Sequence, residues 1–143
     1  MTRLELTVPV AAPASRTWAA VTDWERQGEW ILATSVRVTS GPGRAVGDEF
    51  TAITGIGRFG VVDPMRITRW EPPSLCAVEH LGRVVRGTGE FRVAPAGESA
   101  SEFTWVEDVV LPAIARPAVL AGVRYSLTRF ARFAERYRVD GEG

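Results

Sequence analysis

The sequence predicts an α+β domain in which a curved, seven-stranded antiparallel sheet wraps around a long C-terminal helix. Three observations lead to this prediction. Residues 113–138 repeat apolar side chains with helical spacing, and most of the chain before them alternates between apolar and polar residues as strands do. Tight turn signals separate these alternating segments, which favours antiparallel neighbours.

The predicted C-terminal helix, residues 113–138, would be about 39 Å long at 1.5 Å per residue. Its three- and four-residue spacing places one apolar face along the helix. That face consists of Leu120, Val123, Leu127, Phe130, Ala134 and Tyr137. Burying six side chains of this kind is worth roughly 9–18 kcal/mol before chain entropy is subtracted. We therefore expect a concave sheet around the helix, with room for a pocket between them.

The other elements follow from turns and breaks. A first strand is expected over 4–10, a short helix opens at Pro13, and a second short helical or turn segment covers 23–30. Further strands are expected at about 36–40, 47–56, 61–71, 75–80, 84–94 and 102–110. No linker, repeat or low-complexity segment interrupts the chain, so residues 1–143 are predicted to form one domain.

Strand alternation also predicts which side chains face outward. In the 61–71 strand, Trp70 alternates with Met65 and Ile67 and is expected on the outer face. In the 84–94 strand, Arg86 is expected outward if Phe91 faces inward, unless a bulge at one of the neighbouring glycines reverses the order.

Composition limits the classes of function. The chain has 17 basic and 17 acidic residues, and zero net charge argues against a general nucleic-acid or anionic-membrane role. Every basic residue is arginine, which excludes lysine Schiff-base chemistry. A single cysteine, Cys76, permits no intramolecular disulfide. The N-terminus lacks a signal-peptide pattern and no window is apolar enough to span a membrane, so a cytoplasmic protein without integral membrane association is expected.

Two stretches carry a resemblance to a known family. The segment DPMRITRWEPPSLCAVEHLGRVVRGTGEFRV (63–93) contains a Trp-Glu-Pro-Pro break, then a histidine, then Gly-Arg-Val-Val-Arg-Gly-Thr-Gly. With VPVAAPASRTWAAVTDWERQGEW (8–30), it resembles bacterial polyketide cyclase/dehydrase-like members of the START-like, or SRPBCC, superfamily. The order of elements is also similar to that superfamily, which includes the major birch pollen allergen and lipid-transfer domains.

The resemblance implies a helix-grip fold and a single START-like ligand-binding domain over 1–143. It implies a hydrophobic small-molecule ligand such as a lipid, polyketide or aromatic metabolite. Only some members of the superfamily are enzymes, and no universal catalytic motif can be transferred.

A glycine pattern suggests a dinucleotide-binding site, and a cysteine near a histidine suggests a metal site, but neither interpretation fits the sequence. Residues 55–60 fit G-x-G-x-x-G, but a strand follows them where a dinucleotide site needs a helix, so a hairpin turn is predicted. Cys76 and His80 are about 13 Å apart on a strand, too far to share one metal ion. No cofactor and no metal are expected.

His80 and Glu107 are the candidate catalytic residues. His80 is the only histidine, shares strand parity with Cys76 and Val78, and has an ordinary pKa near neutrality that suits a general base. Glu107 shares parity with Phe103 and Trp105, so its carboxylate would lie in the cavity wall. A hydrogen-bonded core histidine and a solvent-facing glutamate are the structural alternatives.

Aromatic and aliphatic side chains are expected to line the pocket, since such walls suit flat or polycyclic ligands. The candidates are Trp24, Trp30, Val78, Phe103, Trp105, Leu120, Val123 and Leu127.

Two functions remain open from the sequence. One is a binding protein for an apolar small molecule. The other is a polyketide cyclase or dehydratase in which His80 and Glu107 transfer protons. The two differ in whether both side chains face the cavity. A closely packed domain that acts through a partner surface is the third possibility, and the sequence does not indicate an oligomeric state.

Overall fold

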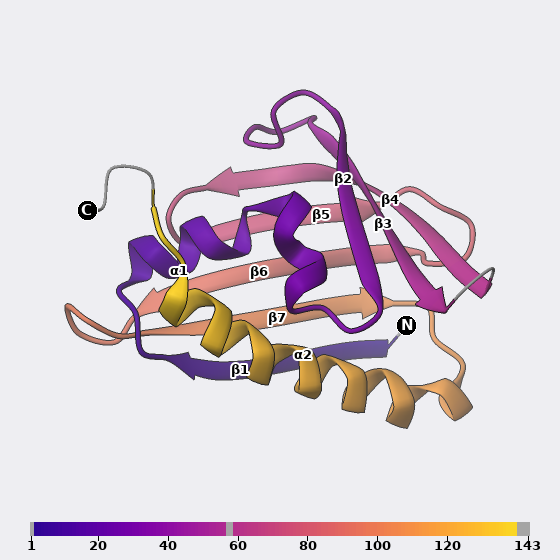
Figure 1. The fold of residues 1–143 in the computed structure, drawn as a ribbon. Helices are drawn as coiled ribbons and strands as arrows, with labels where there is room; N and C mark the ends of the chain where they lie inside the picture. Colours follow the sequence, from indigo (N-terminus) through magenta and orange to yellow (C-terminus); the bar gives the residue numbers. More distant parts are fainter. Residues whose placement is uncertain (1, 57–58, 140–143) are drawn as a thin grey trace.

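The computed structural model describes residues 2–56 and 59–139 (Figure 1). Seven strands, two α-helices and two short 3₁₀ segments (η) make up these residues. In chain order they are β1 (Thr2–Val10), α1 (Ala14–Val21), η1 (Trp24–Glu29), β2 (Thr34–Ser40), β3 (Glu49–Ile56), β4 (Phe59–Glu71), β5 (Leu75–His80), β6 (Gly87–Pro95), β7 (Ser101–Val109), η2 (Ala113–Ala115) and α2 (Arg116–Arg136).

The seven strands form one antiparallel sheet in the order β1-β7-β6-β5-β4-β3-β2. The first strand therefore lies beside the last, while the other strands follow each other as hairpins. Figure 1 shows α1, η1 and α2 on the same face of the sheet, with α2 crossing it in front of β1 and β7. This arrangement confirms the predicted fold of a curved antiparallel sheet that grips a C-terminal helix.

Element boundaries agree with the sequence prediction except at two places. The predicted strand at 84–94 begins only at Gly87, whose φ of +130° lies in a region that side chains rarely adopt. A Cβ there would also collide with the carbonyl oxygen of Asp108 on β7. The predicted helix at 113–138 is divided into η2 and α2, and the 21 residues of α2 span about 32 Å.

A bulge in β4 reverses the predicted orientation of Trp70. Ile67 pairs with Val78 but Arg69 pairs with Ala77, so one residue of β4 is left over between them. The shift places Trp70 opposite the buried Cys76, with its ring centroid 5.1 Å from that of Trp18. The prediction that Trp70 faces outward was therefore wrong, because an extra residue changes the face of every side chain after it. Arg86 is exposed, as predicted.

An aromatic cluster joins the helix to the sheet. Trp30, Phe103 and Phe130 are all completely buried, and the ring of Phe130 lies 4.7 Å from that of Trp30 and 4.5 Å from that of Phe103. Because Phe130 comes from α2 and Phe103 from β7, the cluster fixes the second half of α2 on the sheet. The first half differs, since no residue between Arg116 and Tyr125 is buried.

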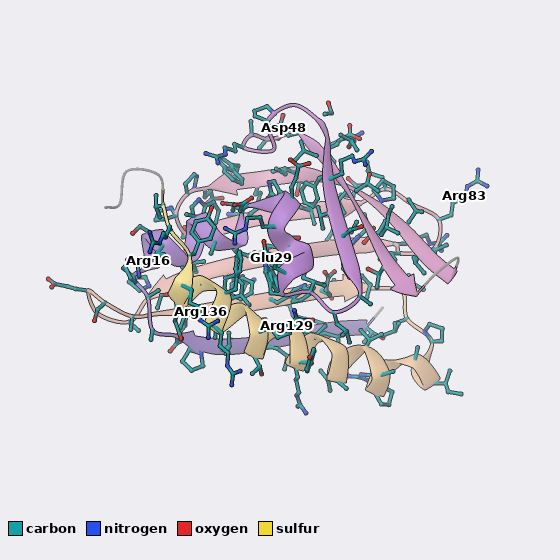
Figure 2. All side chains as sticks on the ribbon, viewed as in Figure 1. Arg16, Glu29, Asp48, Arg83, Arg129 and Arg136 are labelled. Atoms are coloured by element: carbon teal, nitrogen blue, oxygen red, sulfur yellow. The ribbon has the colours of Figure 1, made fainter. Side chains whose placement is uncertain are left out.

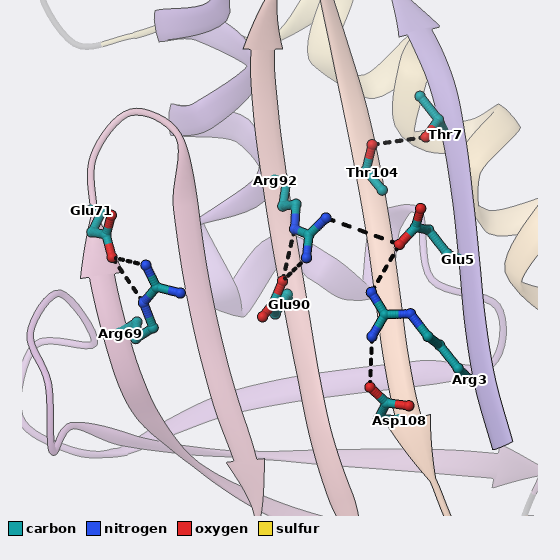
Figure 3. Close-up of polar contacts among 9 residues, drawn as sticks. All are labelled: Arg3, Glu5, Thr7, Arg69, Glu71, Glu90, Arg92, Thr104 and Asp108. Atoms are coloured by element: carbon teal, nitrogen blue, oxygen red, sulfur yellow. Dashed lines mark hydrogen bonds and ion pairs between the residues drawn. The ribbon is translucent and has the colours of Figure 1, made fainter. Parts of the chain in front are cut away.

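The opposite face of the sheet carries ion pairs, some within one strand and some between neighbouring strands (Figure 3). Arg3 of β1 bonds to Asp108 of β7 at 2.7 Å and to Glu5 at 3.0 Å. Arg92 bonds to Glu90 at 2.6 Å. Such exposed pairs contribute little stability each, but they neutralise the arginines that take part in them.

Phe130→Ala tests the importance of the aromatic cluster. Truncating a fully buried phenylalanine leaves a cavity among three elements, so the free energy of unfolding should fall by about 3–5 kcal/mol. Urea denaturation of the wild type and the variant measures this change. Ile114→Ala, at a side chain that is 92% exposed, is the control and should change stability by less than about 0.5 kcal/mol. Equal effects of the two substitutions would contradict the assignment.

Candidate functional site

A cavity of about 330 Å³ lies between the sheet and the first half of α2. In this half of α2 no side chain before Ser126 is buried against the sheet, and the cavity occupies the space between them. The walls come from the η1–β2 segment, from β3 to β7 and from α2. Its lining includes Asp63, Met65, Cys76, Val78, His80, Gly89, Phe91, Trp105, Glu107, Val123 and Ser126.

Ser126 fixes one wall of the cavity. Its hydroxyl donates to the carbonyl oxygen of Gly122 at 2.8 Å and accepts the backbone N–H of Leu32 at 3.0 Å. The two bonds attach the η1–β2 segment to α2 and satisfy a buried hydroxyl. The side of α2 that carries Gly122 and Ser126 therefore forms this wall of the cavity.

Three ionisable side chains form an acid–histidine cluster (Asp63, His80 and Glu107) at one end of the cavity. The Nδ1 of His80 lies 2.8 Å from Oδ1 of Asp63, and its Nε2 lies 2.9 Å from Oε2 of Glu107. The other oxygen of Glu107 accepts the indole N–H of Trp105 at 2.9 Å. The His80 side chain is only 3% exposed, against 15% for Asp63 and 19% for Glu107.

Strand alternation brings these three residues to the inner face. Asp63 shares its parity with Met65 on β4, His80 with Val78 on β5, and Glu107 with Trp105 on β7. Each strand supplies apolar side chains further along the same face, which explains why the polar end is small and the remaining walls are mostly apolar.

Gly89 permits the bond between His80 and Glu107. These residues belong to β5 and β7, and β6 lies between the two strands. Gly89 is the residue of β6 that pairs with Glu107, and a Cβ built there would lie 3.0 Å from Oε2 and 3.1 Å from Oε1 of Glu107. A side chain at this position would displace the carboxylate, so the glycine provides the space through which Glu107 reaches the imidazole.

His80 is held as a cation. Burial by itself lowers the pKa of an imidazole, but the hydrogen bonds to Asp63 and Glu107 and their negative charges outweigh burial and raise the pKa of His80 from 6.5 to about 10. The geometry agrees, since an imidazole can donate from both nitrogens only when it is protonated. The sequence-based expectation of a pKa near neutrality was therefore wrong, and the cluster of two carboxylates and one imidazolium carries a net charge of −1.

The structure places five of the ten predicted site residues at the cavity. His80, Glu107, Val78, Trp105 and Val123 line it. The other five do not: Trp24, Trp30, Phe103, Leu120 and Leu127. All of these except Leu120 are buried in the apolar core.

The positions of these five residues have physical reasons. Trp24 stacks on Phe50 with a centroid separation of 4.2 Å, and its indole N–H donates to the carbonyl oxygen of Gly43 at 2.7 Å. Trp30, Phe103 and Leu127 pack where α2 touches the sheet, because the apolar face of the helix serves the core at its second half. Above the cavity, Val119, Gly122, Val123 and Ser126 face inward, and Leu120 is only half-buried.

Sequence reasoning did not identify Asp63 or Gly89. Asp63 could have been found from its alternation with Met65 and Ile67, both of which are buried. Gly89 gave no comparable signal, because its role depends on the register that places it opposite Glu107.

Two other candidates keep structural roles. The G-x-G-x-x-G pattern belongs to the β3–β4 hairpin, where Gly55 pairs with Gly60, while Gly57 and Arg58 lie outside the described residues. Cys76 lines the cavity, and burial raises the pKa of its thiol to about 12, which makes it a weak nucleophile. Within the described residues, no three His, Cys, Asp or Glu side chains are grouped to hold a metal ion.

A C-terminal helix gripped by the sheet, above a cavity with one polar end, defines a helix-grip domain. The chain belongs to the family described as polyketide cyclase / dehydrase and lipid transport, which matches residues 1–135. This confirms the resemblance seen in the sequence. No curated protein sequence matches the chain. No helix of the described residues is long and apolar enough to cross a membrane.

Solved structures support the same fold. The Zhui aromatase/cyclase from Streptomyces sp. R1128 is 19% identical, with a TM-score of 0.80 over 98% of both chains. A START superfamily protein from Mycobacterium smegmatis is 18% identical, with a TM-score of 0.69 over 93% of this chain and 94% of its own. The di-domain ARO/CYC BexL from the BE-7585A biosynthetic pathway is 16% identical, with a TM-score of 0.75 over 94% of this chain and 47% of its own. At these identities the likeness concerns the fold alone.

The raised pKa of His80 predicts a pH-dependent stability. A group whose pKa is raised in the folded state stabilises the fold fully below its unfolded pKa of 6.5, and this contribution is lost as pH rises toward about 10. The free energy of unfolding should therefore fall between pH 6.5 and 9, and His80→Gln should reduce this slope. Urea denaturation over this range measures it. The range ends at pH 9 because the raised pKa of the Cys76 thiol also makes stability fall with pH, but mainly above its unfolded value of 9.0. An unchanged slope in the variant would contradict the assignment.

Proposed function

We propose that the protein binds an uncharged, largely apolar small molecule in the cavity and orients it by a hydrogen bond to the acid–histidine cluster. One observation carries the proposal: a cavity of about 330 Å³ with mostly apolar walls ends at two partly exposed carboxylates. That volume falls in the range of small-molecule sites, which combine apolar walls with a few polar groups. Membership of a family described by polyketide and lipid ligands supports the same class of ligand.

The charge of the cluster selects the ligand's polar group. The oxygens of Glu107 accept bonds from His80 and Trp105 but each retains a further lone pair. These lone pairs suit a hydroxyl or another uncharged donor. A ligand carboxylate would bring a second negative charge against a cluster of net charge −1, and no arginine of the described chain lines the cavity to compensate.

Matched alcohols and acids test this selectivity. At neutral pH we expect decanol and 2-naphthol to bind at least about tenfold more tightly than decanoate and 2-naphthoate, because like charges at close range cost several kcal/mol even at an effective dielectric constant of about 20. Quenching of tryptophan fluorescence measures binding, and Trp105→Phe identifies the signal from the cavity wall. Glu107→Gln should reduce the difference between alcohol and acid. Absence of saturable binding by all four ligands would contradict the proposal, while equal binding would contradict only its charge selectivity.

A second candidate function, proton transfer in ring closure or dehydration of a polyketide-like chain, is favoured by the same cluster. Glu107 has a carboxylate oxygen at the cavity and could remove a proton from a carbon between two carbonyl groups. The resulting enolate carbon would attack a second carbonyl of the same chain, forming a C–C bond, and the new alkoxide would take up a proton from the imidazolium of His80. Return of the proton from Glu107 to His80 would restore both groups.

In this scheme His80 acts as an acid, not as the neutral base expected from the sequence. Asp63 would be a positioning residue, since it contacts Nδ1 and fixes the ring with Nε2 toward Glu107. The apolar walls would hold the substrate in a folded conformation with its reacting carbons close together. This proximity by itself would lower the barrier to ring closure.

Glu107→Gln separates catalysis from binding. If the cavity catalyses ring closure, the variant should lower turnover by about 10²–10⁴-fold, as loss of a general base does, while the affinity for 2-naphthol changes much less. The assay follows the absorbance of aromatic product formed from a synthetic linear poly-β-ketone thioester. Glu90→Gln is the matched control, because Glu90 belongs to the strand that lines the cavity, while its carboxylate bonds to Arg92 on the opposite face of the sheet. No turnover above background by the wild type, with ligand binding intact, would leave the binding function alone.

A further inference from the structure

A second concave site lies on the outer side of α2, where its last turns face η1. This groove, of about 390 Å³, is lined by Arg26, Glu29, Arg129, Arg132, Phe133, Arg136 and Tyr137. We call it the arginine groove. Glu29, Arg129 and Arg136 are labelled in Figure 2, at the junction between η1 and the second half of α2. None of its residues lines the cavity described above.

The charges of the arginine groove are unbalanced. Four arginines line it against one carboxylate, Glu29, so the lining carries four positive charges and one negative charge. The chain as a whole has 17 of each. On the outer face of the sheet, several arginines are neutralised by neighbouring acids, as Arg3 is by Asp108 and Glu5. Positive charge is therefore concentrated in the groove, although the chain as a whole has no net charge.

Two of the four arginines are held in place. Arg26 bonds to both carboxylate oxygens of Glu29, at 2.6 and 3.2 Å, and its guanidinium lies 4.9 Å from the ring centroid of Phe133. Arg129 donates to the backbone carbonyl oxygen of Glu29 at 2.8 Å. The single acid of the groove is thus occupied by Arg26.

Arg132 and Arg136 make no ion pair with any carboxylate of the described residues. Glu135, the only acid in α2, accepts the backbone N–H of Ala11 instead. Arg129, Arg132 and Arg136 follow three- and four-residue spacing, at which like charges destabilise a helix by a few tenths of a kcal/mol per pair. The groove therefore offers two unpaired guanidinium groups in a repulsive arrangement that a bound anion would relieve.

The helix dipole explains only part of this arrangement. It favours a cation in the last turn, which accounts for Arg136. It does not account for Arg129, which lies further back, or for Arg26, which approaches from η1 and is fixed by Glu29 and an aromatic ring.

We propose that the arginine groove binds a phosphate monoester group. Guanidinium groups bind phosphate oxygens through paired N–H donors, and a dianion matches the excess of positive charge better than a single carboxylate does. The phosphate could belong to a soluble metabolite or to a lipid headgroup, since both present the same oxygens. This site does not depend on the function proposed for the cavity.

Titration calorimetry with phenyl phosphate at constant ionic strength tests the proposal in the full chain. We expect saturable binding that Arg132→Gln/Arg136→Gln weakens by about tenfold or more, because each charge-assisted hydrogen bond contributes strongly. The matched control is Arg116→Gln/Arg124→Gln, which removes the same charge from the same helix outside the groove and should retain wild-type affinity. Binding of 2-naphthol in the cavity should be unchanged in both double variants.

A second arm distinguishes the source of the phosphate. Sedimentation with phosphatidylcholine vesicles that contain phosphatidic acid, compared with phosphatidylcholine alone, reports binding to a headgroup. Loss of binding only in Arg132→Gln/Arg136→Gln, in either arm, supports the site and identifies its source. Equal weakening in both double variants would indicate general charge attraction and overturn the proposal. Absence of binding in both arms would overturn it as well.

Discussion

The contact between the second half of α2 and the sheet is the interaction on which the rest of the structure depends. Leu127, Phe130 and Ala134 are buried there, with Phe130 packed on Trp30 and Phe103. Because the helix is fixed at one end by this aromatic contact, its first half can lie above the sheet without closing on it. The cavity is the space that results, and Ser126 lies at the boundary between the packed and open halves. A single amphipathic helix thus contributes both to the core and to one wall of the cavity.

Most of the fold could be predicted from periodicity and turn signals, because each strand has one buried face and each hairpin has a clear break. Periodicity could not show where a strand contains an extra residue, after which the inward and outward positions are exchanged. The bulge after Ile67 leaves no mark in the sequence, yet it turns Trp70 toward Trp18 and the core. In the same way, the apolar face of α2 predicts that one side of the helix is buried. It does not show that the second half of the helix packs in the core while the first half borders a cavity through neighbouring side chains.

The predicted orientation of side chains agrees with the structure where alternation alone decides it, and differs where depth or register decides it. His80 and Glu107 were placed on the inner face by parity with apolar neighbours, and they lie there. Trp24 and Trp30 were expected in the cavity wall because tryptophans suit ligands, but large aromatic rings fill the core equally well. The protonated state of His80 could not be predicted, because it depends on Asp63 and on the space above Gly89. Each of these contacts joins strands that only the folded register brings together.

The zero net charge of the chain conceals a strong separation of charge. On the outer face of the sheet Arg3 and Arg92 pair with acids of the same or a neighbouring strand. The cavity places two partly exposed carboxylates around one buried imidazolium, and α2 carries five arginines and one glutamate. Burying the acid–histidine cluster costs solvation that its hydrogen bonds must offset, so its net negative charge is a constraint on any ligand that enters. If the cavity excludes anions, as we propose, an anionic group would bind outside it, and Arg132 and Arg136 lie in the groove between the same helix and η1. The two sites proposed on α2 would then select ligands of different charge, which a count of 17 acids and 17 bases does not indicate.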